Sequence, residues 1–140
     1  MFNTSISLDT LNSMSKGNMI DHLGIEFTEI QPGFIKAKMP VDHRTKQPLG
    51  LLHGGASVVL AETLGSVAVV LAVKDPKAET GVGVEINANH LKSARGGYVI
   101  GTCTPLRIGR KIHVYEIKIH DEEENLICAS RLTVAIIPLQ

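Results

Sequence analysis

Glu62 is the one ionisable residue between His53 and Lys74, in a stretch that is otherwise strongly apolar. A carboxylate is costly to bury unless it is paired, hydrogen-bonded or neutralised, so one in such a stretch is a candidate functional group. The alternative is a structural acid that is hydrogen-bonded in an interface. A hydroxyl group follows one helical turn later, at Ser66, and a His-Gly-Gly sequence begins at His53. This short segment therefore offers a carboxylate, a hydroxyl and a flexible backbone together.

The two glycines that follow His53 stand where a helix is expected to begin. Free N–H groups and the positive end of the helix dipole attract negative charge at such a position. Gly55, Glu62 and Ser66 stand seven and four residues apart, which places them near one helical face. Gln47 adds a carboxamide that can orient a carbonyl group or a water molecule. The pattern predicts an oxyanion-binding amide beside a carboxylate, although the histidine can simply close the loop and the glycines can simply permit close packing.

The segment Ala56–Val73 is rich in Ala, Val and Leu, and its length and composition predict a helix rather than a strand. Asp75 and the proline after it are expected to end this helix. Because the helix is apolar on nearly every face, we expect it to be buried on nearly every face, inside a curved sheet. A membrane span is rejected because polar residues between Glu62 and Ser66 interrupt the run and no basic flank marks a cytoplasmic side.

The rest of the chain alternates short helical segments with strand-like ones. A short helix is expected over Ser7–Met14 and a helical turn over Asn18–Leu23. Six segments predict strands, namely Gly24–Gln31, Phe34–Met39, Val82–Leu91, Gly97–Leu106, Lys111–Asp121 and Leu126–Ile137. This order predicts an α+β fold, with a largely antiparallel sheet and one dominant buried helix, in a single domain over residues 1–140.

Composition and motifs exclude several classes of function. The 14 basic and 14 acidic residues balance and the chain has no Trp, so we expect no nucleic-acid partner. No nucleophile elbow and no metal-ligand spacing is present, and a partial dinucleotide-loop match at Gly81 stands in the wrong context. Cys103 and Cys128 are interpreted as reduced core residues, with a disulfide or a nucleophile as the alternative. No signal peptide is evident, so the cytoplasm is the default location.

The run from Gln47 to Ser66, together with the strand sequence Glu-Ile-Asn-Ala-Asn-His at Glu85–His90, resembles the hotdog-fold acyl-CoA thioesterases. The similarity extends from about Leu23 to Ile137. The branch that it resembles holds the 1,4-dihydroxy-2-naphthoyl-CoA hydrolases and the enterobactin proofreading thioesterases, within the 4-hydroxybenzoyl-CoA thioesterase superfamily. The resemblance implies an antiparallel sheet wrapped around a long helix. It also implies homodimers or homotetramers whose active sites combine groups from two chains.

The resemblance assigns roles to the motif residues. Glu62 matches the catalytic carboxylate, which acts as a general base on water or as a nucleophile through a mixed anhydride. Gly54 matches the glycine whose N–H polarises the thioester carbonyl. His53 and Gln47 match residues that orient the thioester and the attacking group, and Ser66 matches a polar residue near the acyl group or the water.

Contacts to coenzyme A are expected at three places in the sequence. They are Gly83; His90, Leu91, Lys92 and Ser93; and Arg107, Ile108, Gly109, Arg110, Lys111 and Ile112. The cations among these residues suit phosphate groups, with a solvated surface as the alternative. For Arg107 and Arg110 the expected phosphate role rests on position and charge alone.

The function expected from the sequence is hydrolysis of acyl-CoA thioesters to a free acid and coenzyme A, with no cofactor. The branch favours an aromatic acyl group, and a medium aliphatic chain or an acyl-carrier-protein thioester remains open. Two rivals are a hotdog hydratase or dehydratase of acyl thioesters and a non-catalytic acyl-CoA-binding module. A mere binding module need not keep both Glu62 and Gln47, which argues against the second rival.

Overall fold

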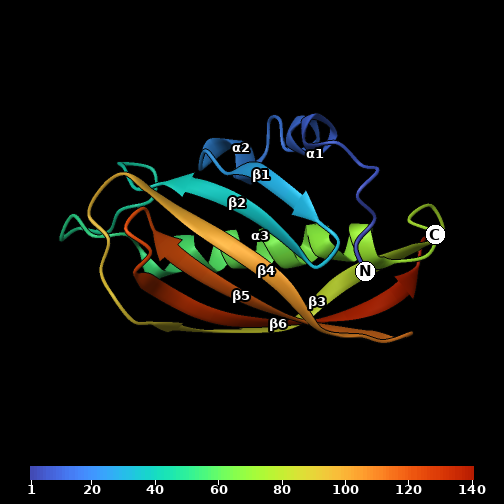
Figure 1. Ribbon diagram of the computed structural model, residues 1–140. Helices are drawn as coiled ribbons and strands as arrows, with labels where there is room; N and C mark the ends of the chain where they lie inside the picture. Colours follow the sequence, from blue (N-terminus) through green and yellow to red (C-terminus); the bar gives the residue numbers. More distant parts are fainter.

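The computed structural model describes residues 1–140, and a six-stranded sheet curves around one long helix in it (Figure 1). The helix is α3, Gly54–Ala72, and the strands are β1 Glu26–Gln31, β2 Phe34–Pro40, β3 Glu79–His90, β4 Tyr98–Ile108, β5 Ile112–Asp121 and β6 Leu126–Pro138. The order across the sheet is β1-β2-β4-β5-β6-β3, and every neighbouring pair is antiparallel. The predicted α+β class and the six predicted strands are confirmed, although β3 begins three residues before the predicted Val82.

Alternation of side chains along β2 separates the core from the solvent. Ile35, Ala37 and Met39 are fully buried against the core. The lysines between them point to the outer face, where Lys36 and Lys38 lie within 3.8 Å of glutamates on β1. The period of two expected for a half-buried strand therefore decides which face of this hairpin carries the helix.

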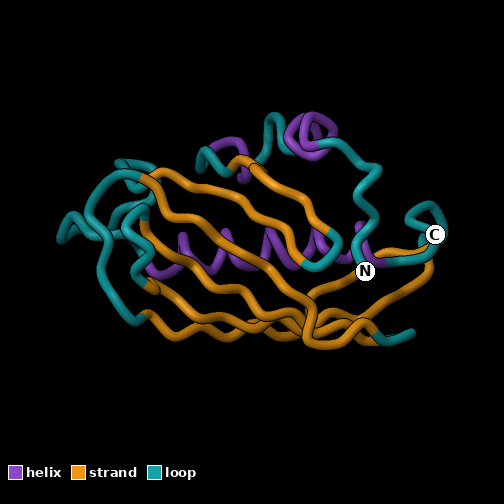
Figure 2. Tube along the Cα trace, viewed as in Figure 1, coloured by secondary structure: helices purple, strands orange, loops and turns teal.

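The sheet covers only part of α3, so one face of the helix stays open. Ten of its 19 residues are buried, but Gly55, Glu62 and Ser66 are exposed. The expectation of a helix buried on nearly every face, with a buried carboxylate, was therefore wrong for the single chain. Figure 2 shows the reason, since the strands curve along one side of the helix without closing around it. The three exposed residues share one face, as their spacing predicts.

Helix α3 is also the one helix that is long and apolar enough to cross a bilayer. Its buried side chains pack instead on the inner face of the sheet, within a hydrophobic core of 26 residues. Cys103 and Cys128 belong to this core as free, buried thiols, so the prediction of unpaired core cysteines is confirmed.

The two edge strands of the sheet, β1 and β3, have different surroundings. Helices α1 (Leu8–Met14) and α2 (Met19–His22) lie beside the β1 edge in Figure 1. The Asn12 side chain accepts a hydrogen bond from the Phe27 N–H at 2.8 Å and donates to the Phe27 carbonyl at 3.1 Å, so it occupies backbone groups of β1. Strand β3 pairs only with β6, and its other edge has no partner in the chain. Such an edge is a template for pairing with another strand.

Candidate active site

A cleft of about 340 Å³ lies at the N-terminal end of α3. It is bounded by the loop before α3, the first turn of the helix, the end of β3 and the segment that follows it. The lining residues are Gln47, Leu51, Leu52, Gly54, Ser57, His90, Leu91, Lys92, Ser93, Ala94 and Ile127. The structure therefore brings Gly54 and Gln47 together with the segment His90–Ser93, which stands about forty residues later in the chain.

Hydrogen bonds at the start of α3 leave one backbone donor free. The His53 N–H donates to the Thr45 carbonyl at 2.8 Å, and His53 Nδ1 accepts the Gly55 N–H at 2.8 Å as the N-cap. The Ala56 N–H donates to the His53 carbonyl at 3.0 Å. Gly54 N–H has no acceptor in the chain, and Gly54 lines the cleft. This unpaired N–H at the positive end of the helix dipole suits an oxyanion.

The His90 ring packs directly over Gly54. A β-carbon on Gly54 would lie 2.7 Å from His90 Nε2, which is closer than van der Waals contact permits. A side chain at this position would therefore displace the histidine and fill the cleft beside the free N–H. The tight packing explains why the first residue of this helix is glycine, and it joins the end of β3 to the helix start.

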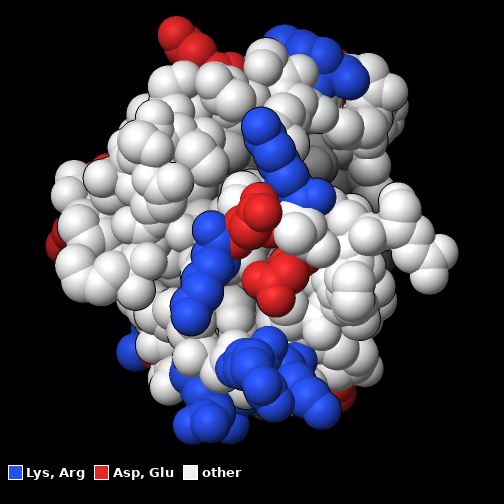
Figure 3. Space-filling view, turned by 90° about the vertical axis from the view of Figure 1, so that its right-hand side faces the viewer, with Lys and Arg blue, Asp and Glu red and all other residues white.

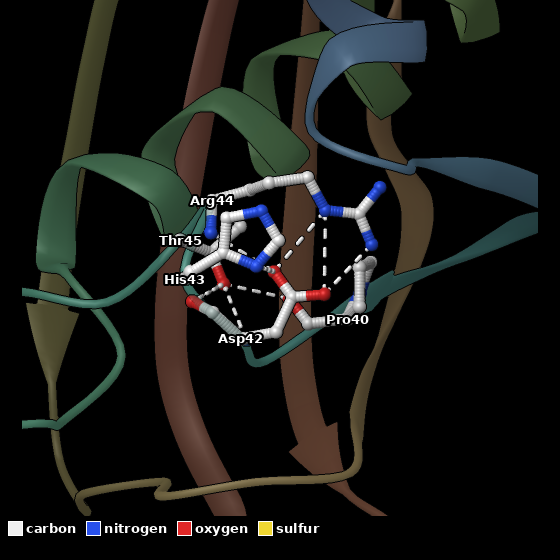
Figure 4. Close-up of polar contacts among 5 residues, drawn as sticks. All are labelled: Pro40, Asp42, His43, Arg44 and Thr45. Carbon is white, nitrogen blue, oxygen red and sulfur yellow. Dashed lines mark hydrogen bonds and ion pairs between the residues drawn. The ribbon is translucent and has the colours of Figure 1, made fainter.

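The loop that leads into α3 is held by the polar contacts drawn in Figure 4. Thr45, which is buried, donates its hydroxyl to the Pro40 carbonyl at 2.7 Å. Asp42 accepts hydrogen bonds from Arg44 Nη2 at 2.7 Å and Nε at 3.1 Å. Because the Thr45 carbonyl also accepts the His53 N–H, this loop fixes where the helix begins.

The Asp42–Arg44 contact predicts that the protein loses stability over a defined range of acidic pH. Side-chain and backbone hydrogen bonds from Arg44 lower the pKa of Asp42 from 3.8 to about 2. A depressed pKa in the folded state stabilises the protein above the unfolded pKa, and that contribution is lost as the pH falls from about 4 to 2. Asp42→Asn is expected to flatten the dependence of the urea unfolding midpoint on pH across this window. The matched control Glu123→Gln, at an exposed position, is expected to keep the wild-type slope; an equal change in both variants would contradict the assignment.

Two further residues complete the chemistry of the cleft. The Gln47 Oε1 atom accepts the Leu49 N–H, so the side-chain amide of Gln47 keeps its N–H groups for other acceptors. Ser57, which is almost fully buried, also lines the cleft and was not singled out in the sequence. Its position three residues after Gly54 is the signal that could have found it, because residues three apart share a helical face.

Glu62 and Ser66 do not line this cleft. They lie on the exposed face of α3, with the Glu62 carboxylate beside β3: a β-carbon on Gly83 would lie 3.0 Å from Glu62 Oε1. Glu62 is the eighth residue after Gly54, which corresponds to about 12 Å along the helix axis. One chain therefore presents the free N–H and the carboxylate at two different places.

Comparison with known proteins decides the family. Residues 49–128 match the model of the thioesterase superfamily, which is more than half of the chain. The chain belongs to the thioesterase superfamily. Over 132 residues it is 54% identical to the 1,4-dihydroxy-2-naphthoyl-CoA hydrolase of Escherichia coli, covering 94% of this chain and 96% of that protein. It is 47% identical over 131 residues to the proofreading thioesterase EntH of Cronobacter turicensis, covering 94% of each.

Solved structures give the same result for the fold. A thioesterase from Haemophilus influenzae superposes with a TM-score of 0.94 at 46% identity, covering 99% of this chain and 95% of that one. A mutant thioesterase from Pseudomonas aeruginosa superposes with a TM-score of 0.96 at 43% identity, covering 99% of both chains. The predicted hotdog fold and the predicted thioester hydrolase are thereby confirmed.

In this thioesterase the last group of expected coenzyme A contacts lies apart from the cleft. Residues 107–112 cover the end of β4, the turn at residues 109–111 and the first residue of β5, near the C-terminal end of α3 and the chain termini, at the right of Figure 1. A second cavity of about 430 Å³ opens there, and it shares no residue with the cleft at Gly54. Figure 3 views this end, where Lys and Arg side chains gather along the lower edge.

Proposed function

We propose that this thioesterase hydrolyses acyl-CoA thioesters in the cytoplasm, with Gly54 N–H as the oxyanion donor and Glu62 as the general base or nucleophile. The observation that carries the proposal is the free Gly54 N–H in the cleft at the start of α3. An N–H donor aimed at a developing oxyanion stabilises the transition state by about 3–4 kcal/mol. The names of the Escherichia coli and Cronobacter turicensis relatives support a thioester substrate, and the first of them supports an aromatic acyl-CoA.

The reaction follows one of two balanced routes. In the first, Glu62 takes a proton from water, the hydroxide adds to the thioester carbonyl, and the C–S bond then breaks to release the thiolate of coenzyme A. In the second, the carboxylate oxygen of Glu62 adds to the carbonyl, the thiolate leaves, and water cleaves the resulting mixed anhydride. In both routes the carbonyl oxygen becomes negative and accepts the Gly54 N–H, while Gln47 orients the thioester.

Distance along the helix argues that two chains build each site. A thioester carbonyl must lie about 3 Å from its amide donor and within reach of the base, whereas Gly54 and Glu62 of one chain are about 12 Å apart along α3. The Glu62 that serves a given Gly54 therefore comes from a second copy of this chain. This pairing also explains the exposure of Glu62 and Ser66, because a partner covers that face.

The free edge of β3 is the surface that we assign to this partner. It lies next to the exposed face of α3, since Gly83 of β3 contacts the region of Glu62. Val82 and Val84 on this strand are 47% and 58% exposed, so apolar side chains flank the open edge. Pairing two β3 edges removes the open template and forms a homodimer, and a homotetramer forms if two such dimers associate.

Thiol release with a disulfide dye tests the activity and the substrate class together. The panel is benzoyl-, dihydroxynaphthoyl-, phenylacetyl-, hexanoyl- and palmitoyl-CoA. We expect fast release from one of the aromatic substrates. Mass spectrometry of the products identifies the rivals, because hydration of an unsaturated acyl-CoA adds the mass of water and a binding module leaves the thioester unchanged. No release from any member, by folded protein, would contradict acyl-CoA hydrolysis and favour a carrier-protein thioester.

Mixing two inactive variants tests the two-chain site. Glu62→Gln chains and Gly54→Pro chains are unfolded together in equal amounts and refolded. Half of the dimers are then mixed, and each has one intact site of two, so about a quarter of the wild-type rate is expected. Each variant refolded alone serves as the control. If the mixture is as inactive as the separate variants, while size analysis shows mixed dimers, the site is formed within one chain.

A further inference from the structure

His113 and Tyr115 form a buried polar pair at the end of the molecule opposite the cleft. They follow each other on the inner face of β5 and are 2% and 0% exposed. The His113 Nδ1 and Tyr115 Oη atoms are 2.8 Å apart, and the rings meet edge to face. The Tyr115 ring also packs against Phe2, at 6.3 Å between centroids. Neither residue has a role in the proposed chemistry.

Packing alone does not account for this pair. Two buried polar groups lose their hydration, and an apolar pair such as leucine and phenylalanine fills a similar space without that cost. A hydrogen-bonded pair, in contrast, fixes the orientation of both rings. A role for the pair therefore depends on which group the oriented His113 ring holds in place.

The oriented ring lies against the turn between β4 and β5. His113 and Gly109 line the same 430 Å³ cavity, together with Arg110. His113 is the sheet partner of Ile108, the residue before Gly109. Burial lowers the pKa of His113, and the Gly109 backbone acts in the opposite direction. If Tyr115 donates to Nδ1, the neutral ring carries its proton on Nε2, which can then donate to the Gly109 carbonyl.

The turn is short and carries two cations, Arg110 and Lys111, with Arg107 just before it at the end of β4. The Gly109 N–H donates to the Ile112 carbonyl at 2.9 Å, and the Lys111 carbonyl accepts the Ile136 N–H at 2.8 Å. The Arg107 side chain folds back beside Gly109, since a β-carbon on that glycine would lie 3.3 Å from Arg107 Nε. The position of Gly109 therefore influences where the cations of residues 107–111 point.

We propose that His113, held by Tyr115, is a positioning residue that fixes the β4–β5 turn so that its cations meet the phosphates of coenzyme A. The proposal rests on the proposed function, because it takes an acyl-CoA as the substrate. Its effect is confined to the nucleotide end of the substrate, far from the thioester. His113 variants therefore alter KM for coenzyme A thioesters and leave kcat unchanged.

The test compares two substrates that share one acyl group. Benzoyl-CoA carries the nucleotide, and benzoyl-N-acetylcysteamine lacks it. We expect His113→Leu to raise KM for benzoyl-CoA about tenfold, the equivalent of one lost charge-assisted contact, with kcat within about twofold. KM for benzoyl-N-acetylcysteamine is expected to stay unchanged. His113→Gln keeps an N–H donor on a flexible arm and is expected to recover most of the loss.

Two further variants separate positioning from general loss of stability. Tyr115→Phe removes only the hydroxyl, and it is expected to raise KM for benzoyl-CoA in the same direction as His113→Leu. Ile117→Val removes one methylene from the same buried face of β5 and is expected to leave both KM values unchanged. If His113→Leu behaves like Ile117→Val, or raises both KM values by the same factor, the positioning role is wrong.

Calorimetric titration with coenzyme A itself distinguishes this proposal from the proposed function. It measures Kd without turnover, and we expect His113→Leu to weaken binding by about the same factor as KM. Binding of coenzyme A that depends on His113, without hydrolysis of any acyl-CoA, would contradict the proposed function and support the positioning role. Wild-type protein that neither binds coenzyme A nor hydrolyses its thioesters would overturn both.

Discussion

Glu62→Gln is expected to lower kcat by about 10³-fold while leaving the fold and the binding of coenzyme A intact. The amide has the shape of the carboxylate but can neither take a proton from water nor attack the thioester carbonyl. Glu62 is exposed in the single chain and makes no hydrogen bond or ion pair there, so its replacement removes no stabilising contact within that chain. Steady-state thiol release and circular dichroism measure the two parts of this expectation.

The matched control for Glu62 is Glu85→Gln. Glu85 is an exposed carboxylate on the same strand that lies beside Glu62, and its one polar partner is the Asn87 side chain. This variant is expected to keep the wild-type rate. Near-normal turnover by Glu62→Gln, or an unfolded Glu62→Gln protein, would remove Glu62 from the catalytic assignment. Rapid-quench mass spectrometry separates its two possible roles, because a mixed anhydride adds the mass of the acyl group to the chain.

Gly54→Pro is expected to lower kcat by about 10²- to 10³-fold, because it deletes the proposed oxyanion donor. Proline suits the first position of a helix, where its missing N–H has no intrahelical acceptor. The preceding residue, His53, already has the extended conformation that a following proline requires, with φ −68° and ψ 130°. The helix is therefore expected to form, and the loss falls on the transition state.

Gly54→Ala provides the control for steric effects. Both substitutions add a β-carbon that would lie 2.7 Å from His90 Nε2 and so displace that ring. Only proline also removes the N–H. We expect Gly54→Ala to retain clearly more activity than Gly54→Pro. Equal losses in the two variants would assign the effect to displacement of His90, and wild-type rates in folded Gly54→Pro would exclude the oxyanion role.

Local sequence determined the helices and strands of this protein and the class of reaction that its motif residues suit. Ser7 caps the first helix by accepting the Thr10 N–H, and alternation along Phe34–Met39 places the lysines outside the sheet. The long apolar run predicted the central helix, and the spacing of Gly55, Glu62 and Ser66 predicted their common face. These features depend on neighbours within a few residues, so a short stretch of sequence is sufficient to predict each of them.

The spacing of the motif could not show which backbone donor is free or how much of α3 is covered. His53 takes up the Gly55 N–H, and only the arrangement of Thr45, His53 and the helix start leaves Gly54 unpaired. The exposure of Glu62 depends on how far one curved sheet reaches around the helix. A helix that is apolar on every face gives no indication of which face the sheet leaves open.

Only the tertiary structure decided the relations between distant segments. The strand order β1-β2-β4-β5-β6-β3 sets β3 at an open edge beside Glu62, and the contact of His90 with Gly54 joins the end of that strand to the helix start. The buried His113–Tyr115 pair likewise shows its relation to the β4–β5 turn only once β5 has an inner face. Strand order is set by hydrogen bonds between residues far apart in sequence, so no local pattern could predict it.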